Sequence, residues 1–190
     1  MLYLPPMWAH DGIAEGECMT YSVGFRSPKQ DELARELFLR LSDAPDECPK
    51  DVVYKDPKQT AVAHPGEIPA ALLDFARQAL EKALAEPLAL ERALGETLSD
   101  PKPGVWFEPA DDFGLIENVR LNQRTRMLYD AQHIFINGES YLAAGRDAEL
   151  MRQLADTRQL SSAEVQQLSD DALQLLSSWV DAGWAHSTAG

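Results

Sequence analysis

The sequence predicts an α+β protein built from three parts, and three observations carry that prediction. Residues 1–26 contain two strand-like runs, residues 27–102 carry apolar side chains at helical spacing, and residues 103–190 mix strand and helix patterns. Clusters of turn-forming residues separate the parts at 26–28 and at 99–104. We therefore expect domains at 1–26, 27–102 and 103–190.

Composition and charge narrow the classes of function. Hydrophobic residues make up 45% of the 190 residues, which is ordinary for a globular protein. All three parts are acidic, with 1, 10 and 6 basic against 3, 15 and 13 acidic residues and a total net charge of -14. Such a surface repels phosphate backbones and attracts basic partners, so we expect no nucleic-acid partner, although net charge alone seldom names a partner.

No apolar run approaches the roughly 18 residues that a membrane span needs, and the first residues do not form a secretory signal. The two cysteines, Cys18 and Cys48, lie far apart without a C-x-x-C spacing and are expected to be free thiols. We expect a cytoplasmic protein without a membrane partner.

The first part is expected to form strands that belong to a larger sheet. One run is residues 1–5, a Pro-Pro turn follows, and the second run extends from Cys18 to Phe25. A hairpin of this size has no adequate core of its own. The remaining strands of the sheet are therefore expected outside these residues.

The second part is expected to be a small helical module. Ser27, Pro28 and Gln30 have the spacing of a capping box with proline at the first helical position. A proline-rich loop over 43–66 follows, and an apolar stripe then begins at Ile68 and continues to Ala83. Pro87 opens a further helix. The stripe is longer than the short helices of one chain can cover, so we expect a homodimer.

The third part is expected to be a winged-helix-like module, because strands and three helices share about 80 residues. Strands are predicted at 126–130, 133–136 and 139–143, with a tight turn at Asn137-Gly138. Helices are predicted from Asp147 to Thr157, from Ser161, and from Ser169 to Gly183. Trp106, Phe107, Trp179 and Trp184 are expected to be core anchors. The helices carry far more acidic than basic groups, which argues against a DNA-reading role.

One histidine has a notable setting. His10 follows the Pro-Pro turn, where an imidazole can point into the mouth of a barrel. A lone histidine is more often structural than a metal ligand, because a metal needs several converging ligands. Thr20 and Ser22 share one face of the following strand and either line a substrate mouth or hydrogen-bond inside a barrel.

The run from Leu2 to Gly12, and the run from Gly16 to Pro28 after it, resemble the distal metal-histidine segment of the JmjC-type (cupin) ribosomal oxygenases. The order of the modules that follow is also similar, so the resemblance covers essentially the whole chain. It implies that residues 1–26 are the edge of a double-stranded β-helix barrel. It also implies that 27–102 is a dimerisation module and that 103–190 is a winged-helix-like module.

The resemblance makes His10 the second histidine of a 2-His-1-carboxylate triad that binds Fe(II), with 2-oxoglutarate as co-substrate. The family's other two ligands come from an upstream H-x-D/E pair, and none of the four histidines here begins such a triplet. Asp11 is discounted, because neighbouring residues on a strand point to opposite faces. His64 is expected to be structural.

The implied function is that of a protein hydroxylase acting on an arginine of a basic ribosomal protein, number sixteen of the large subunit. The chain alone is expected to be inactive, since it carries one ligand of the triad. The alternative is a dimeric protein-interaction module without catalysis. Neither the hydroxylated residue nor the missing ligands follow from the sequence.

Overall fold

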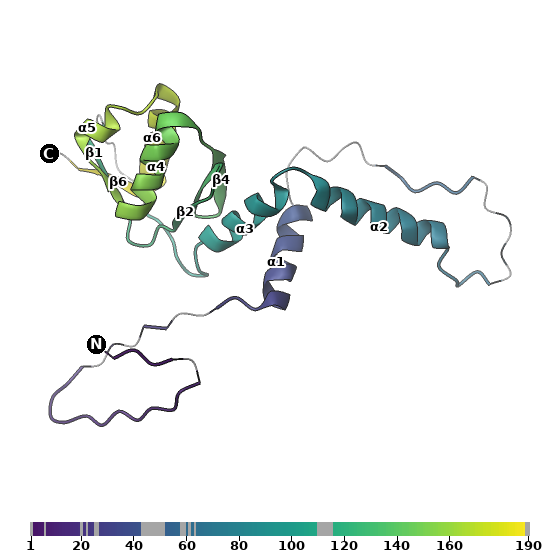
Figure 1. The fold of residues 1–190 in the computed structure, drawn as a ribbon, viewed down its shortest axis with the longest axis horizontal. Coiled ribbons are helices and arrows are strands. Elements are labelled where there is room, and N and C mark those ends of the chain that lie inside the picture. The colour runs from purple at the N-terminus through teal and green to yellow at the C-terminus, as the bar shows by residue number, and fades with distance from the viewer. Residues whose placement is uncertain are drawn as a thin grey trace.

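The computed structural model describes residues 2–5, 7–19, 21, 23–24, 27–42, 52–57, 60, 62, 64–109 and 116–188. Figure 1 shows a compact C-terminal module, three helices that lead away from it and an N-terminal segment whose described residues form no helix or strand. The described part of the chain contains no helix that is long and apolar enough to cross a bilayer.

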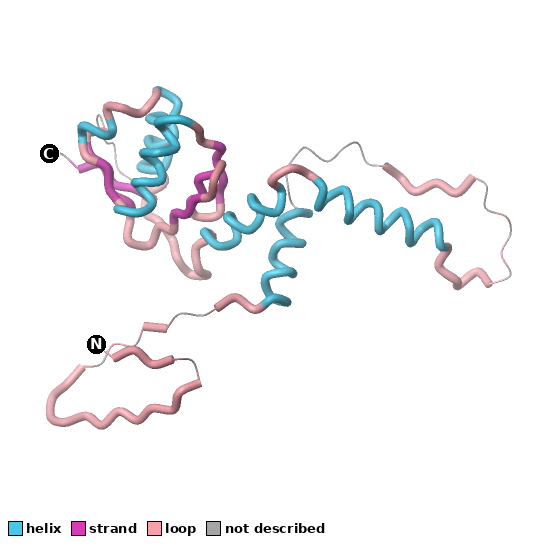
Figure 2. Tube along the Cα trace, viewed as in Figure 1, coloured by secondary structure: helices cyan, strands magenta, loops and turns pink. Residues whose placement is uncertain are grey.

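The strands expected within residues 1–26 are not present in the described part of that segment. Residues 2–5, 18–19, 21 and 23–24 have no strand assignment, and Figure 2 draws them as loop. Tyr3, Tyr21 and Val23 are exposed. A strand needs a neighbour for its backbone hydrogen bonds, and no described strand lies beside these residues. The rest of the second run, including Thr20 and Ser22, lies outside the described residues.

Three helices form the second part: α1 (Gln30–Ser42), α2 (Ala70–Ala85) and α3 (Ala89–Ser99). All three were predicted, but α1 begins two residues after the expected position, Pro28. Its first turn is closed by the amide of Leu33, which donates to the carbonyl of Lys29 at 2.9 Å. Lys29 therefore takes the place at the start of the helix that the capping-box spacing assigned to Ser27.

The apolar stripe on α2 has the expected helical spacing, but no residue of α2 is buried. Leu80 is 58% exposed, and Ile68 just before the helix is 73% exposed. Figure 1 shows α2 projecting away from the C-terminal module. An edge-on packing of Tyr54 on Phe75, with ring centroids 5.6 Å apart, covers a little of it.

The predicted hairpin strands are confirmed as β2 (Met127–Tyr129), β3 (His133–Ile136) and β4 (Glu139–Leu142), an antiparallel sheet of order β2-β3-β4. The turn between β3 and β4 is Asn137-Gly138, with φ of 48° and 91°. Both angles lie in the left-handed region that a tight hairpin turn needs, and asparagine and glycine tolerate it best. The side-chain oxygen of Asn137 also accepts from the amide of Arg126 at 3.0 Å.

A second antiparallel sheet was not predicted. It joins β1 (Asn118–Leu121), β5 (Gln159–Leu160) and β6 (Ala185–Thr188) in the order β5-β1-β6. In the central strand, Val119 and Leu121 are buried while Arg120 between them is exposed. This sheet brings the end of the chain against its middle.

The helices of the C-terminal module are α4 (Gly145–Thr157), α5 (Ser162–Val165) and α6 (Asp170–Asp181). The amide of Ser161 donates to the carboxylate of Glu164 at 2.7 Å, as the second capping box predicts. This bond holds the pKa of Glu164 below its ordinary value. Ser169 caps α6 by accepting from the amide of Ala172 at 3.3 Å.

The core lies between these helices and the two sheets. Its largest fully buried side chains all belong to the C-terminal module apart from Ser99: Val119, Ile134, Ile136, Leu150, Leu154, Leu160, Leu176, Trp179 and Val180. The prediction that Trp179 anchors the core is confirmed. The same prediction was wrong for Trp106, which is 64% exposed and lies under the guanidinium of Arg124, 5.7 Å from the ring centroid. Phe107 and Trp184 are partly buried and pack edge-on against each other.

The helix α3 joins the second part to this core. A Cβ atom placed on Gly95 would lie 2.2 Å from the ring of Phe135 in β3, so only glycine permits this approach. Arg40 of α1 donates to the carboxylate of Asp100 at 2.6 Å and to the carbonyl of Gly138 at 3.3 Å. These hydrogen bonds hold the C-terminal ends of α1 and α3 against the turn of the β3–β4 hairpin.

Candidate functional site

The predicted metal ligand, His10, lies in the N-terminal segment, whose described residues form no strand. Its imidazole is exposed, and Nδ1 is 3.5 Å from the carbonyl oxygen of Trp8. Asp11 beside it is exposed as well. Thr20 and Ser22, the predicted substrate-mouth residues, lie outside the described residues.

The other histidines do not converge on His10. His64 is exposed in the loop before α2, His133 is buried in β3, and His186 is in β6. Among the residues that the structure describes, no group of three or more histidine, cysteine, aspartate or glutamate side chains is placed to hold a metal ion. The described residues therefore do not fit a complete iron site, and His10 contributes at most one ligand.

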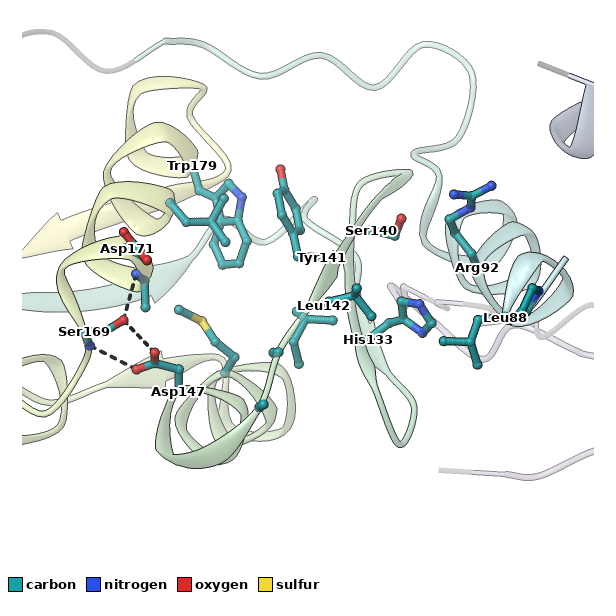
Figure 3. Close-up of a pocket in the computed structure, with 17 residues that line it drawn as sticks. Leu88, Arg92, His133, Ser140, Tyr141, Leu142, Asp147, Ser169, Asp171 and Trp179 are labelled. Carbon is teal, nitrogen blue, oxygen red and sulfur yellow. Dashed lines mark hydrogen bonds between the residues drawn. The ribbon is translucent and has the colours of Figure 1, made fainter. Parts of the chain in front are cut away.

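A cavity lies elsewhere, between α3, the β3–β4 hairpin, α4 and α6. It has a volume of about 700 Å³. Figure 3 shows Leu88 and Arg92 on one side, Tyr141 and Trp179 on another, and Asp147 and Ser169 below them. Leu88 precedes α3 with a φ of 63°, a left-handed conformation that is unusual for leucine and turns the chain from α2 into α3.

Tyr141 and Trp179 form one wall of this cavity. Their rings pack edge-on with centroids 5.7 Å apart, and the Tyr141 hydroxyl donates to the carboxylate of Glu139. Burial raises the pKa of Tyr141, and the bond to Glu139 raises it further, to about 12. The indole N–H of Trp179 lowers the pKa of Tyr141. In the described structure this N–H has no acceptor at full hydrogen-bond geometry.

Two carboxylates near the cavity are held by local bonds. Asp147 accepts from the hydroxyl of Ser169 at 2.6 Å and from its amide at 3.0 Å, which ties α4 to the start of α6. Asp130 accepts from the amide of His133 at 2.6 Å and lies 3.1 Å from its ring nitrogen. Partial burial acts to raise the pKa of Asp130, but the hydrogen bonds from Gln132 and His133 outweigh it and hold that pKa below its ordinary value.

A second cavity of about 750 Å³ lies between α1, α3 and the hairpin. Arg92, Ser140 and Tyr141 belong to the lining of both cavities. Ser140 is fixed there by donating to the carboxylate of Glu96 at 2.6 Å. We call the two cavities together the junction groove, since both lie where the helical part packs on the C-terminal module.

Sequence reasoning did not find this groove. It identified Trp179 as a core residue and placed Tyr141 on a strand, but neither residue carried a signal of a cavity. The groove arises from the packing of α3 on the hairpin, which unites residues far apart in the sequence. The close approach of Gly95 to Phe135 is a tertiary contact that no local sequence pattern predicts.

Comparison with known families finds two matches along the chain. Residues 78–186 match the model described as ROXA-like winged helix, and residues 1–33 match a JmjC domain. The first match includes all of α3, the whole sheet β2-β3-β4, and the second sheet as far as the first half of β6. The second includes His10 and the beginning of α1.

Relatives with known names agree with these matches. The chain is 25% identical over 199 aligned positions to the ribosomal protein uL16 3-hydroxylase of Escherichia coli strain K12, covering 97% of this chain and 51% of that protein. The chain thus spans about half the length of the curated relative that it matches.

Solved structures share the fold. The crystal structure of the Escherichia coli ribosomal oxygenase YcfD is similar with a TM-score of 0.65 at 21% identity, over 87% of this chain and 48% of that one. A structure of YcfD with cobalt and 2-oxoglutarate gives a TM-score of 0.64 at 20% identity, over 86% of this chain and 47% of that one. The predicted α+β class is confirmed.

Proposed function

Because the chain belongs to the ROXA-like winged-helix family, we propose that it is the C-terminal part of a non-haem Fe(II)- and 2-oxoglutarate-dependent protein hydroxylase. The observation that carries the proposal is the order of the two family matches, a JmjC segment at 1–33 followed by the winged helix at 78–186 in one chain. The solved YcfD complex with cobalt and 2-oxoglutarate supports the choice of metal and co-substrate.

In this proposal His10 is one iron ligand, and the other two come from residues outside the described chain. An exposed imidazole with only a 3.5 Å contact to a carbonyl is free to turn toward a metal. An iron site of this type has three protein ligands, and its remaining positions are open. The 190 residues supply one of the three ligands, so alone they are inactive. Thr20 and Ser22 are retained as proposed residues of the substrate mouth.

The proposed substrate is an arginine of a basic ribosomal protein, number sixteen of the large subunit, modified in the cytoplasm. Support comes from the printed name of the uL16 hydroxylase relative and from the acidic surface, with a net charge of -14. An acidic surface speeds the encounter with a basic protein and disfavours nucleic acid. We propose the domain boundaries 1–26, 27–102 and 103–190 for the same protein.

A homodimer through the second part belongs to the proposal. The exposed apolar stripe of α2 supports it, because water-exposed leucines along one helix face are unfavourable unless another surface covers them. Sedimentation equilibrium at micromolar concentration is expected to give a dimer. Leu80→Arg should yield monomer, whereas Gln78→Arg, a neighbouring exposed change, should not. A wild-type monomer would contradict the dimer.

The alternative is a non-catalytic interaction module, favoured by the incomplete metal set in the described residues. Hydroxylation by a longer protein that includes the upstream sequence distinguishes the two. With Fe(II), 2-oxoglutarate and the ribosomal protein, mass spectrometry is expected to detect one added oxygen on an arginine. His10→Ala should abolish the product, and His64→Ala should retain it. Full activity of His10→Ala would refute the ligand assignment.

A further inference from the structure

The strand β4 is an outer strand of its sheet, so one of its sides has no neighbouring strand in the described structure. An antiparallel ladder bonds every second residue to the neighbour and turns the backbone groups of the others away. The amide of Ala143 donates to the carbonyl of Gln132 at 3.1 Å, which fixes this alternation. Tyr141 therefore bonds to β3, whereas Ser140 and Leu142 each turn an N–H and a C=O away from it. No described residue bonds to these outward groups.

The first cavity of the junction groove lies beside this strand. Its lining includes the whole stretch 140–144, and its volume is about 700 Å³. Figure 3 shows the hairpin between Arg92 on one side and Asp171 on the other. Residues 140–144 contain no charged side chain and no proline, which commonly protect an edge strand from pairing. Space and bonding groups for one more strand thus lie together.

The side chains of β4 alternate between the two walls of this cavity. The Ser140 hydroxyl donates to Glu96 of α3 at 2.6 Å, so Ser140 and Leu142 point to the α3 side. Tyr141 packs on Trp179 of α6 with ring centroids 5.7 Å apart, so it points to the other side. A strand added beside β4 continues this alternation, and its successive residues face α3 and α6 in turn.

Each wall presents one charge to such a strand. Arg92 on α3 and Asp171 in the first turn of α6 line the cavity, and neither side chain bonds to another described residue. The other carboxylate of the described lining, Asp147, is already bonded to Ser169. An acidic residue next to a basic one in an extended strand therefore matches both walls. A second copy of β4 lacks this pair, because residues 140–144 are uncharged.

We propose that β4 binds an extended peptide segment of another protein as a fourth strand of its sheet. The peptide backbone pairs with the outward groups of Ser140 and Leu142. An acidic and a basic residue, adjacent in the peptide, contact Arg92 and Asp171. In such strand addition the backbone bonds supply affinity and the side-chain contacts supply selectivity. The proposal goes beyond the hydroxylase proposal and uses no part of the metal site.

The test uses the whole chain and a short labelled peptide with glutamate beside lysine at its centre. Valine and threonine surround this pair, because β-branched residues favour strands. Fluorescence anisotropy measures affinity, and hydrogen exchange followed by NMR reports on single amides. Binding is expected to slow exchange at Ser140 and Leu142 about ten-fold or more. The amide of Tyr141, already bonded to β3, should change little. Unchanged exchange at Ser140 and Leu142 in the bound chain would overturn the proposal.

Methylated peptides show whether the peptide backbone makes the bonds. Methyl groups on every second backbone nitrogen remove either the amides that face β4 or those that face away from it. One of the two methylated peptides is expected to bind about ten-fold more weakly or worse, and the other should bind like the parent. Equal affinities of the two would refute strand addition, since side chains alone would then hold the peptide.

Variants of the chain test the same contacts. Leu142→Pro removes the outward N–H without removing a bond to β3, and it should weaken binding about ten-fold. Leu142→Ala keeps the N–H and should weaken binding less than about three-fold. Equal affinities of these two variants would contradict the proposal, and the methylated peptides decide the question if Leu142→Pro folds poorly.

A charge variant tests the side-chain contact. Arg92→Gln should weaken binding of the parent peptide about two- to five-fold and leave unchanged the binding of a peptide with glutamine in place of glutamate. Equal losses for both peptides would rule out the proposed pairing of Arg92. Slower exchange at Leu142 on raising the protein concentration without peptide would assign the edge to a second copy. The same effect of a short single-stranded RNA would assign it to nucleic acid, and either result would refute the proposal.

Discussion

The helices α2 and α6 have similarly apolar sequences, but only α6 buries its apolar face against its own chain. In the C-terminal module the stripe of α6 is covered by its own chain, and Leu176 is fully buried. On α2 a stripe of the same helical spacing remains open to water. Among described residues, no hydrophobic side chain before Ala89 is buried. A helical stripe thus predicts a face that will be covered, but not which chain covers it.

The largest expected effect compares one leucine from each region. Leu154 is fully buried in the core, whereas Leu80 is mostly exposed. Leu154→Ala should lower the free energy of unfolding of the C-terminal module by about 2–5 kcal/mol, through lost burial and the cavity left behind. Leu80→Ala should change the free energy of unfolding of that module by less than about 0.5 kcal/mol, because Leu80 lies on α2, outside the module. Urea unfolding measures both, and similar losses would erase the difference between the regions.

The next effect concerns the helix that connects the regions. Alanine in place of glycine inside a helix usually stabilises it by about 1 kcal/mol. At Gly95 the sign should reverse, because the new Cβ would overlap the buried ring of Phe135. We expect Gly95→Ala to cost about 1–3 kcal/mol. Gly66→Ala, in the turn before α2, is the control for added volume alone, since nothing lies within 4 Å of its Cβ position. A stabilised Gly95→Ala would show that α3 does not pack on β3.

A smaller effect is expected at the link between α1 and the hairpin. Arg40 is partly buried and bonded to both Asp100 and Gly138, so Arg40→Gln should cost about 1 kcal/mol. Arg77 pairs with Asp74 on the surface of α2 at 2.7 Å. Arg77→Gln should cost less than about 0.5 kcal/mol. Thermal unfolding compares the two variants. An equal cost for Arg40→Gln and Arg77→Gln would show that α1 does not pack on the C-terminal module.

The smallest effect depends on pH. The pKa of Asp130 is lower in the folded chain than its ordinary value of 3.8, so its ionised form stabilises the fold. That contribution is present above the unfolded pKa and is lost as pH falls through the folded pKa. Asp130→Asn should therefore destabilise the module at neutral pH, by a margin that shrinks below about pH 4. Asp181→Asn is the control. A margin that grows in acid would contradict the assignment.

Local signals account for what the sequence predicted well. The turn at Asn137-Gly138 and the capping box at Ser161 and Glu164 act over a few residues, and both are present as expected. The sheet β5-β1-β6 was missed because its strands have two to four residues and come from distant parts of the chain. Their pairing depends on tertiary packing, which leaves no turn signal between them.

The two candidate sites differ in the same way, since one was found from local sequence signals and the other depends on tertiary packing. His10 was identified through the Pro-Pro turn and the resemblance of its surroundings, and its role as a ligand stays a prediction. The junction groove combines residues from α1, α3, the hairpin and α6, so no sequence window contains it.

Hydrogen exchange along the whole chain tests the contrast between the two regions most directly. Amides of β3, α4 and α6 are expected to exchange slowly at every protein concentration, because their own chain covers them. Amides of α2 are expected to exchange quickly at nanomolar concentration and more slowly at micromolar concentration, as a second copy covers the stripe. Exchange from α2 that is slow and independent of concentration would contradict the account.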